Sequence, residues 1–256
     1  MKKIFHKYFS ETIFSLSSKQ SKSFSFNFEG LLDLFYPHRC PSCNIPCKKP
    51  EIFCPTCRES IEPIVEPLCP RCFIPYERGD SHLCNSCRLN PPPFKRAVAV
   101  FRYGGEIATA IQKFKYSGQV HLGIPLGSLL RHHLEALNPE IITPVPLDPA
   151  RLSGRGFNQS FFLIKGATRK TKSRIIPRLL MRLHRGSPQA AKTISERKKL
   201  KSSVFAVRYP KLIRNRRVLL VDDVMTTGAT ATACSRAIIK AGAESVSVLV
   251  LARTVR

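Results

Sequence analysis

From residue 97 onward, short and mostly apolar runs alternate with longer segments of helical periodicity. The apolar runs predict buried strands at residues 97–101, 141–146, 218–221 and 246–251. Apolar positions spaced three or four apart predict helices at residues 106–116, 120–135, 158–168 and 229–241. Because strands without polar alternation are buried on both faces, we predict an α/β fold, with a parallel sheet flanked by helices. In such folds, ligands bind at the carboxyl ends of the strands.

Residues 31–90 follow a different pattern, with few aliphatic positions and nine of the ten cysteines of the chain. Eight of these cysteines form four CxxC pairs: Cys40/Cys43, Cys54/Cys57, Cys69/Cys72 and Cys84/Cys87. A CxxC turn brings two thiolates to one side of a tight loop, and two such turns supply four soft ligands for a tetrahedral Zn²⁺ ion. The spacing therefore predicts a small zinc-ribbon module with one or two structural zinc ions, whose binding stabilises a segment too short to fold alone.

The ligand pairing within this module is open at the level of sequence. The simplest scheme joins the first CxxC pair to the second and the third to the fourth, whereas a cross-braced scheme uses the same eight residues. Cys47 is extra, as a free thiol or an alternative ligand, and His38 or His82 could replace one cysteine. A disulfide framework is disfavoured, because paired CxxC spacing is typical of metal sites. Cys234, far from the module, is expected to be a small core residue.

The N-terminal residues place limits on targeting and on domain organisation. No run reaches the roughly 18 consecutive apolar residues of a membrane helix. Lys7 and Glu11 interrupt the first apolar run, which argues against a secretory signal, although a basic, Ser-rich start leaves an organelle transit peptide open. The Pro-rich stretch at residues 90–93 reads as a stiff linker. The predicted parts are a flexible basic extension (1–30), a double zinc ribbon (31–90) and the sheet domain (94–256).

The charge of the chain favours anionic partners. Its 42 Lys and Arg residues exceed its 17 Asp and Glu residues, which gives a formal net charge of +25. Such a field attracts nucleic acids, nucleotides, anionic membranes and polyphosphorylated metabolites, and does not choose among them. The basic residues are concentrated in residues 165–217, where Glu196 is the single acid. This stretch is interpreted as a solvated loop, as an anion-facing surface, or as both.

The segment from Val218 to Thr230 combines two kinds of chemistry. Its apolar strand runs into two adjacent carboxylates, Asp222 and Asp223. Small and hydroxyl residues then enter a helix, and their free backbone N–H groups are suited to hold a phosphate. These residues are Thr226, Thr227, Gly228, Ala229 and Thr230. A sugar phosphate explains both halves, because its hydroxyls can donate hydrogen bonds to the carboxylates. The carboxylates can also meet a Mg²⁺ ion that the ligand carries.

This segment resembles the phosphoribosyl-diphosphate motif of type I phosphoribosyltransferases. The resemblance implies that Asp222 and Asp223 bind the ribose hydroxyls and that residues 226–230 bind the 5-phosphate. The turn at residues 144–148 resembles the pyrophosphate loop of the same class. This second likeness implies diphosphate contacts from Val145, Pro146, Leu147, Arg151 and Arg155. Thr226 stands where purine-salvage members usually carry an Asp, which disfavours purine salvage.

A wider set of motifs is similar to the ComF competence-protein family. The motifs are Phe114–Gly118, Arg155–Ser160, Gln189, Glu196–Arg197 and Phe205, behind the N-terminal CxxC pairs. The resemblance implies a double zinc ribbon ahead of a phosphoribosyltransferase domain, and a cytoplasmic protein. It also implies a link to uptake of single-stranded DNA in natural transformation, with competence-machinery proteins as partners. Leu200 departs from the family pattern, in which an Asn is usual.

Catalysis is left open by the sequence, which shows no acceptor pocket and no obvious general base. An active enzyme of this class would displace pyrophosphate from C1 of the ribose, so that positioning and charge stabilisation are the tasks of the protein. Lys115, Arg182, Arg185 and Arg197 are candidates to close over the departing diphosphate, and residues 182–201 are a candidate lid.

Two non-enzymatic hypotheses stand beside the enzyme. In the first, the protein handles nucleic acid, and Tyr116, Phe157 and Phe161 stack on bases beside basic residues. In the second, the protein senses phosphoribosyl diphosphate and regulates a partner through the zinc module.

Overall fold

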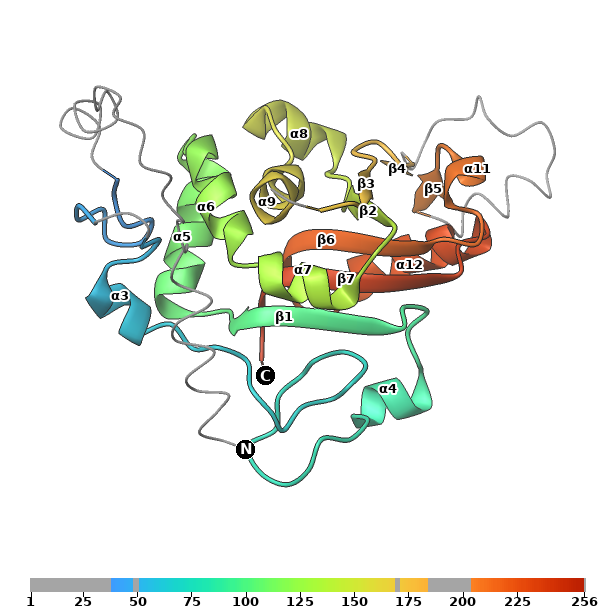
Figure 1. Cartoon of the computed structure of the whole chain (residues 1–256), viewed down its shortest axis with the longest axis horizontal. Helices are drawn as coiled ribbons and strands as arrows, with labels where there is room; N and C mark the ends of the chain where they lie inside the picture. Colours follow the sequence, from blue (N-terminus) through green and yellow to red (C-terminus); the bar gives the residue numbers. More distant parts are fainter. Residues whose placement is uncertain (1–37, 48–50, 169–170, 184–203, 256) are drawn as a thin grey trace, which may run out of the picture.

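The computed structural model describes residues 38–47, 51–168, 171–183 and 204–255 (Figure 1). Several sequence predictions lie outside the described residues. They are the extension 1–30, most of the candidate lid, Arg185, Gln189, Glu196, Arg197 and Leu200.

The centre of the molecule is a five-stranded sheet in which all neighbouring strands are parallel. In sheet order the strands are β1 (Arg96–Arg102), β7 (Ser245–Arg253), β6 (Arg217–Met225), β2 (Ile141–Pro144) and β3 (Arg174–Ile175). Successive residues from Val218 to Val221 are all buried, so both faces of the sheet are covered. The α/β prediction is confirmed.

Helices surround this sheet, and a small antiparallel pair lies beside it. The helices are α5 (Gly105–Tyr116), α6 (Gly123–Ser128), α7 (Arg131–Leu137), α8 (Pro149–Arg155), α9 (Gln159–Ala167), α11 (Pro210–Ile213) and α12 (Ala229–Lys240). The pair consists of β4 (Leu180–Arg182) and β5 (Phe205–Val207). Helix α9 packs on β2 and β6, and α12 packs on β6 and β7 (Figure 1).

The segment predicted as one helix over residues 120–135 is broken into three pieces. A 3₁₀ turn, η1 (Val120–Leu122), precedes α6 and α7. The break has a local cause, because Pro125 lacks a backbone donor and two glycines weaken the helix. Packing gives a second cause: a side chain at Gly127 or at Gly166 would collide with the backbone of the facing helix. Small residues therefore let α6 and α9 approach closely.

Strand β6 is longer than predicted, and its length decides where the acidic pair lies. It continues through Asp222 and Asp223 to Met225, because β7 pairs with it over that whole distance. On its other side, β2 pairs only as far as Val221 and turns away at Pro144. The two carboxylates therefore lie where β6 keeps one neighbouring strand and loses the other, the position at which parallel sheets open a crevice.

The cysteine-rich segment lies along β1, the outermost strand on this side (Figure 1). Ile64 N–H donates to Val100 O (2.9 Å) and Arg102 N–H donates to Glu62 O (2.9 Å). Further along, Ala97 N–H donates to Arg71 O (2.8 Å). Backbone hydrogen bonds thus fasten this segment to the sheet at two places.

Candidate functional site

The eight paired cysteines form two groups of four. Within each group, the Sγ atoms all lie within 4.8 Å of one another. The first ribbon is the group Cys40, Cys43, Cys54 and Cys57, and the second ribbon is the group Cys69, Cys72, Cys84 and Cys87. This is the simpler of the two pairing schemes. In each ribbon one CxxC pair lies in a tight turn and the other opens a short helix, α3 (Pro55–Glu59) or α4 (Asn85–Leu89).

The geometry of both groups fits a zinc ion. The Sγ atoms of Cys43 and Cys54 are 3.6 Å apart, and those of Cys72 and Cys84 are 3.7 Å apart. A tetrahedron with Zn–S bonds of about 2.3 Å has an edge of about 3.8 Å. Although burial opposes ionisation, backbone N–H groups lower the pKa of Cys40 to about 7 and that of Cys69 to about 6. Backbone N–H groups therefore favour the thiolate, the form that binds metal, at Cys40 and Cys69, whereas burial raises the pKa of Cys72 to about 11.

The alternative ligands considered from the sequence lie outside both groups. The ring of His38 bonds to Glu51 O (2.7 Å) and that of His82 bonds to Asp80 O (2.8 Å). Cys47 donates to Ile45 O (3.4 Å). Cys234 is fully buried in α12, as expected for a core residue.

The acidic pair on β6 is held by two neighbouring elements. Lys115, near the end of α5, places its Nζ 2.8 Å from Asp223 Oδ1, and both side chains are largely buried. Ser160, at the start of α9, donates to Asp222 Oδ1 (2.9 Å). The backbone N–H of Asp223 donates to the same oxygen (2.9 Å). Side chains from α5 and α9 and a backbone amide of β6 itself thus converge on the two carboxylates.

The environment of Asp222 makes its ionisation unfavourable. Burial raises its pKa to about 7, and the charge of Asp223 acts in the same direction, while the Ser160 bond opposes the shift. Two adjacent carboxylates can share a site when one is proton-bearing or when hydrogen-bond donors and cations approach. The arrangement is suited to accept hydrogen bonds from ligand hydroxyls.

The loop after β6 shares a cavity with Asp222, one member of the acidic pair. Asp222 and residues 224–231 line a cavity of about 60 Å³, room for a compact group such as a phosphate. Gly228 has φ +79°, a conformation that favours glycine, and it caps the N-terminus of α12. Thr226, Thr227, Ala229 and Thr230 are exposed. The first backbone N–H groups of a helix have no acceptor within the helix, and here that of Ala229 donates to Thr227 Oγ1 (3.3 Å).

The turn after β2 is buried at Val145 and half-buried at Pro146 and Leu147. Asn158 Nδ2 donates to Val145 O (2.9 Å), which fixes the turn against α9. The structure places Arg151 on the exposed face of α8.

Two further basic candidates within the described part of the chain, Arg155 and Arg182, already have partners. Arg155 donates to the hydroxyl of Tyr116 (2.8 Å), and its guanidinium lies 4.6 Å from the centre of that ring. Arg182, on β4, is 3.5 Å from Asp148 and lies over the ring of Phe205.

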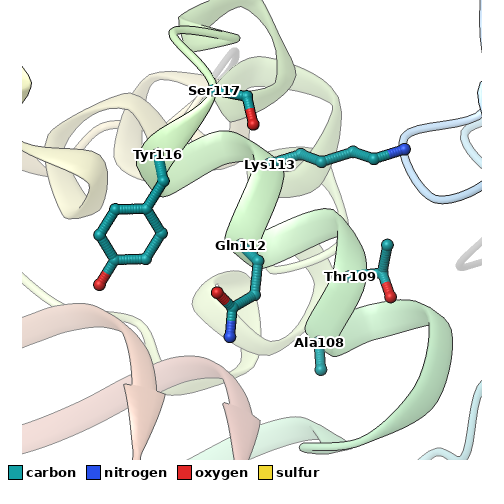
Figure 2. A pocket seen from close by; sticks show the side chains of 6 residues that line it. All are labelled: Ala108, Thr109, Gln112, Lys113, Tyr116 and Ser117. Atoms are coloured by element: carbon teal, nitrogen blue, oxygen red, sulfur yellow. The ribbon is translucent and has the colours of Figure 1, made fainter.

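Helix α5 connects this site to the first ribbon. Glu106, in its first turn, accepts from the hydroxyl of Ser42, and Lys113 donates to Ser42 O. Figure 2 shows Lys113 extended toward the first ribbon, while Tyr116 points away from it. The same outer face of α5 borders an open groove of about 410 Å³ lined by six residues: Ala108, Thr109, Gln112, Lys113, Tyr116 and Ser117.

Several of these contacting residues were not singled out by the sequence. Ser160 lies in the ComF-like motif Arg155–Ser160, but no role was predicted for it. The other three residues, Ser42, Glu106 and Lys113, lie in no predicted motif. Their partners are distant in the chain, so no local spacing identifies them.

None of the described helices has both the length and the apolarity to cross a membrane.

Comparison with known proteins gives two domain matches and several relatives. Residues 31–88 match the double zinc ribbon domain, and residues 182–255 match the phosphoribosyl transferase domain. The DNA utilization protein YhgH of Escherichia coli is 32% identical over 197 residues, which cover 73% of this chain and 84% of that protein. Competence protein F of Haemophilus influenzae is 30% identical over 230 residues, which cover 86% and 98%.

A solved structure of the allosteric regulatory enzyme of purine biosynthesis is 17% identical, covers 50% of this chain and 26% of that chain, and has a TM-score of 0.37. A TM-score this low supports no conclusion about the family of this chain.

Proposed function

This chain belongs to the ComF family, and from that premise we propose that it binds phosphoribosyl diphosphate with Mg²⁺ at the carboxyl edge of its sheet. The observation that carries the proposal is the meeting of Asp222 with the loop 226–230 around one cavity. A pair of carboxylates alone would repel an anionic ligand, and a phosphate-binding loop alone has no need of them. A ribose phosphate uses both.

Each part of the site then has a task in binding the ligand. Asp222 and Asp223 accept hydrogen bonds from the ribose hydroxyls. Residues 226–230 hold the 5-phosphate through backbone N–H groups, aided by the dipole of α12. Lys115 keeps Asp223 neutralised before the ligand arrives, since the two side chains are already paired at 2.8 Å. When bound, Mg²⁺ offsets the charge of the diphosphate.

The diphosphate end of the ligand is assigned to the turn after β2. The turn is formed by Val145, Pro146 and Leu147. It is followed on α8 by Arg151 and Arg155. A guanidinium offers a fork of donors that suits phosphate oxygens. A phosphoribosyltransferase reaction at this site would release pyrophosphate from C1 of the ribose. The candidates to stabilise the charge of the departing pyrophosphate are Lys115, Arg182, Arg185 and Arg197.

The zinc module completes the proposal. The eight paired cysteines are assigned as the ligands of two structural zinc ions, and residues 31–90 as their module. Residues 94–256 are assigned to the sheet domain and residues 1–30 to an extension. We assign the protein to the cytoplasm, as expected for its family.

Calorimetry with phosphoribosyl diphosphate and Mg²⁺ tests ligand binding. We expect the wild-type chain to bind and Asp223→Asn to weaken binding by at least roughly tenfold, the effect of losing about 1.4 kcal/mol. Asp80→Asn is the matched control, since this exposed Asp lies in the second ribbon. Equal heats for Asp223→Asn and wild type would contradict the proposal. A pyrophosphate-release assay with candidate acceptors then separates an enzyme from a sensor.

A link to DNA uptake is the second part of the proposed function. Its support comes from relatives named for competence and DNA utilization and from the net charge of +25. Tyr116 is 68% exposed beside Arg155, an arrangement that can stack on a base. Titration of single-stranded DNA at several salt concentrations tests this part: a steep loss of affinity with salt supports it, and salt-independent or absent binding counts against it.

A further inference from the structure

The start of α9 contacts two separate parts of the candidate ligand site. Asn158 Nδ2 donates to Val145 O (2.9 Å), in the turn after β2. The hydroxyl of Ser160 donates to Asp222 Oδ1 (2.9 Å), on β6. Successive residues of a helix point about 100° apart, so neighbouring side chains can reach different elements. One helix turn therefore joins the turn assigned to the diphosphate to the strand that carries the acidic pair.

Gln159 lies between these two residues and contacts a third part of the site. Its exposed surface is 0%. A buried amide is unfavourable unless its polar atoms have partners. The amide oxygen faces α8 and accepts from Arg155 Nη1 (2.5 Å) and Nε (3.2 Å). The buried acceptor of Gln159 is thus used on a cation of the candidate site.

A glycine turn makes this contact possible. Gly156 follows α8 with φ +75°, in the left-handed region, and its N–H donates to Leu152 O (2.8 Å). Only residues 156–158 separate α8 from α9. The last residue of α8, Arg155, and the first residue of α9, Gln159, therefore lie in contact.

The guanidinium of Arg155 is held from two sides by neutral groups. Gln159 binds its Nε and Nη1, and the hydroxyl of Tyr116 accepts from its Nη2 (2.8 Å). A guanidinium carries more N–H donors than these two acceptors use. Arg182, by contrast, faces the carboxylate of Asp148 (3.5 Å). The contacts of Arg155 with Gln159 and Tyr116 therefore fix its orientation and leave its positive charge available to an anion.

We propose that Gln159 is a positioning residue, which fixes the guanidinium of Arg155 for the diphosphate end of the ligand. Its neighbour Ser160 fixes Asp222 for the ribose end. This role rests on the proposed binding of phosphoribosyl diphosphate, and it separates the diphosphate contact from the ribose contact. Only the diphosphate contact depends on the buried amide of Gln159.

Two ligands that share the ribose phosphate and differ in the diphosphate test this division. Calorimetry on the full, zinc-loaded chain in Mg²⁺ compares phosphoribosyl diphosphate with ribose 5-phosphate. Gln159→Met keeps the length of the side chain and removes the acceptor. We expect this variant to weaken phosphoribosyl diphosphate about tenfold and ribose 5-phosphate less than about twofold, because it removes hydrogen bonds to one cation only.

Two further variants show that the selectivity belongs to Gln159. Ser160→Ala is expected to weaken both ligands by a similar factor, because both use Asp222. Gln112→Met is the matched control, since this exposed Gln on α5 bonds to the hydroxyl of Tyr103. It is expected to bind both ligands as the wild type does. Equal weakening of the two ligands by Gln159→Met would overturn the proposal.

A double-mutant cycle tests whether Gln159 acts through Arg155. In the Arg155→Met background, Gln159→Met is expected to change the affinity for phosphoribosyl diphosphate by less than about twofold. A further loss of about tenfold in that background would overturn the positioning role.

The remaining outcomes separate this role from the proposed function. Wild-type binding together with wild-type affinities in Gln159→Met would overturn the role of Gln159 and leave the proposed function standing. Absence of phosphoribosyl diphosphate binding by the wild type would overturn both. If Gln159→Met does not fold, Gln159→Asn replaces it, because the shorter side chain cannot reach the guanidinium. Failure of both variants to fold would assign Gln159 to the core and overturn the proposal.

Discussion

The two ribbons have almost the same ligand spacing and very different surroundings. Cys40, Cys54 and Cys57 of the first ribbon belong to the main hydrophobic core, together with Phe53 and the strands. In the second ribbon, Cys69, Cys72 and Cys87 form a separate small cluster covered by Ile74 and Tyr76. One ribbon is therefore a part of the sheet core, and the other is a smaller satellite cluster that reaches the core through Leu68 and Phe73.

This difference shows that the spacing of the cysteines does not by itself determine how much a metal site contributes to the stability of the protein. Parts of a protein with few shared apolar contacts open at a lower free energy than the core. We expect the first ribbon to unfold only with the sheet, and the second to open by itself.

Removal of one ligand from each ribbon is the strongest way to break the comparison. Cys54→Ser is expected to cost about 4–5 kcal/mol and to lower Tm by roughly 10–20 °C, because it disrupts the core as well as a metal site. Cys84→Ser is expected to leave the main transition within about 5 °C of the wild type. Calorimetric melting in excess zinc measures both, and equal shifts would show that the ribbons are equivalent.

Truncation of one apolar side chain beside each ribbon compares the two ribbons while leaving their metal ligands unchanged. Phe53 is fully buried and Ile74 is partly exposed. We expect Phe53→Ala to cost about 3–5 kcal/mol and Ile74→Ala about 1 kcal/mol, in proportion to the buried contact each loses. Urea unfolding followed by circular dichroism checks this order. A larger cost at Ile74 would contradict the satellite description.

Hydrogen bonds sharpen the comparison at a smaller scale. Ser42 is 4% exposed and bonds to Glu106, whereas Ser81 is exposed and bonds to Leu68 N–H (3.0 Å). Ser42→Ala is expected to cost about 1–2 kcal/mol, because it leaves the half-buried carboxylate of Glu106 with one donor fewer, and Ser81→Ala under about 1 kcal/mol. The same urea titration detects both.

Ligand affinity is a further readout of the Ser42 contact. Only Ser42→Ala is expected to reduce this affinity, because Ser42 bonds to Glu106 at the start of α5 and Lys115 near the end of α5 pairs with Asp223.

The smallest effect is expected at the ninth cysteine of the module. Cys47 lies near the first ribbon but outside its group of four. Cys47→Ser is expected to change stability by less than about 0.5 kcal/mol and to leave zinc content at the wild-type value. A loss of zinc, measured by elemental analysis, would identify Cys47 as a ligand.

Local patterns in the sequence were enough for the alternation of strands and helices and for the CxxC turns. These features depend on residues a few positions apart. The length of β6 could not be predicted, because it depends on β7 pairing as far as Met225. The break near Gly127 depends on the closeness of α9.

The site shows the same division between local and distant information. Asp222, Asp223 and the loop 226–230 stand together in the sequence, and Asp222 and the loop line one cavity. Ser160 and Lys115 reach the acidic pair from other helices, α9 and α5. A single Ser or Lys carries no spacing that would reveal such a partner.

The hydrogen bonds between residues 62–64 and β1 have a consequence for handling the protein. A truncated chain that starts near residue 94 would expose the outer backbone groups of β1, a template on which a second chain can add a strand. Aggregation of such a fragment would then reflect an uncapped sheet rather than an intrinsically insoluble domain. Solubility is better preserved by removing residues before the first ribbon than by separating the cysteine-rich segment from the sheet.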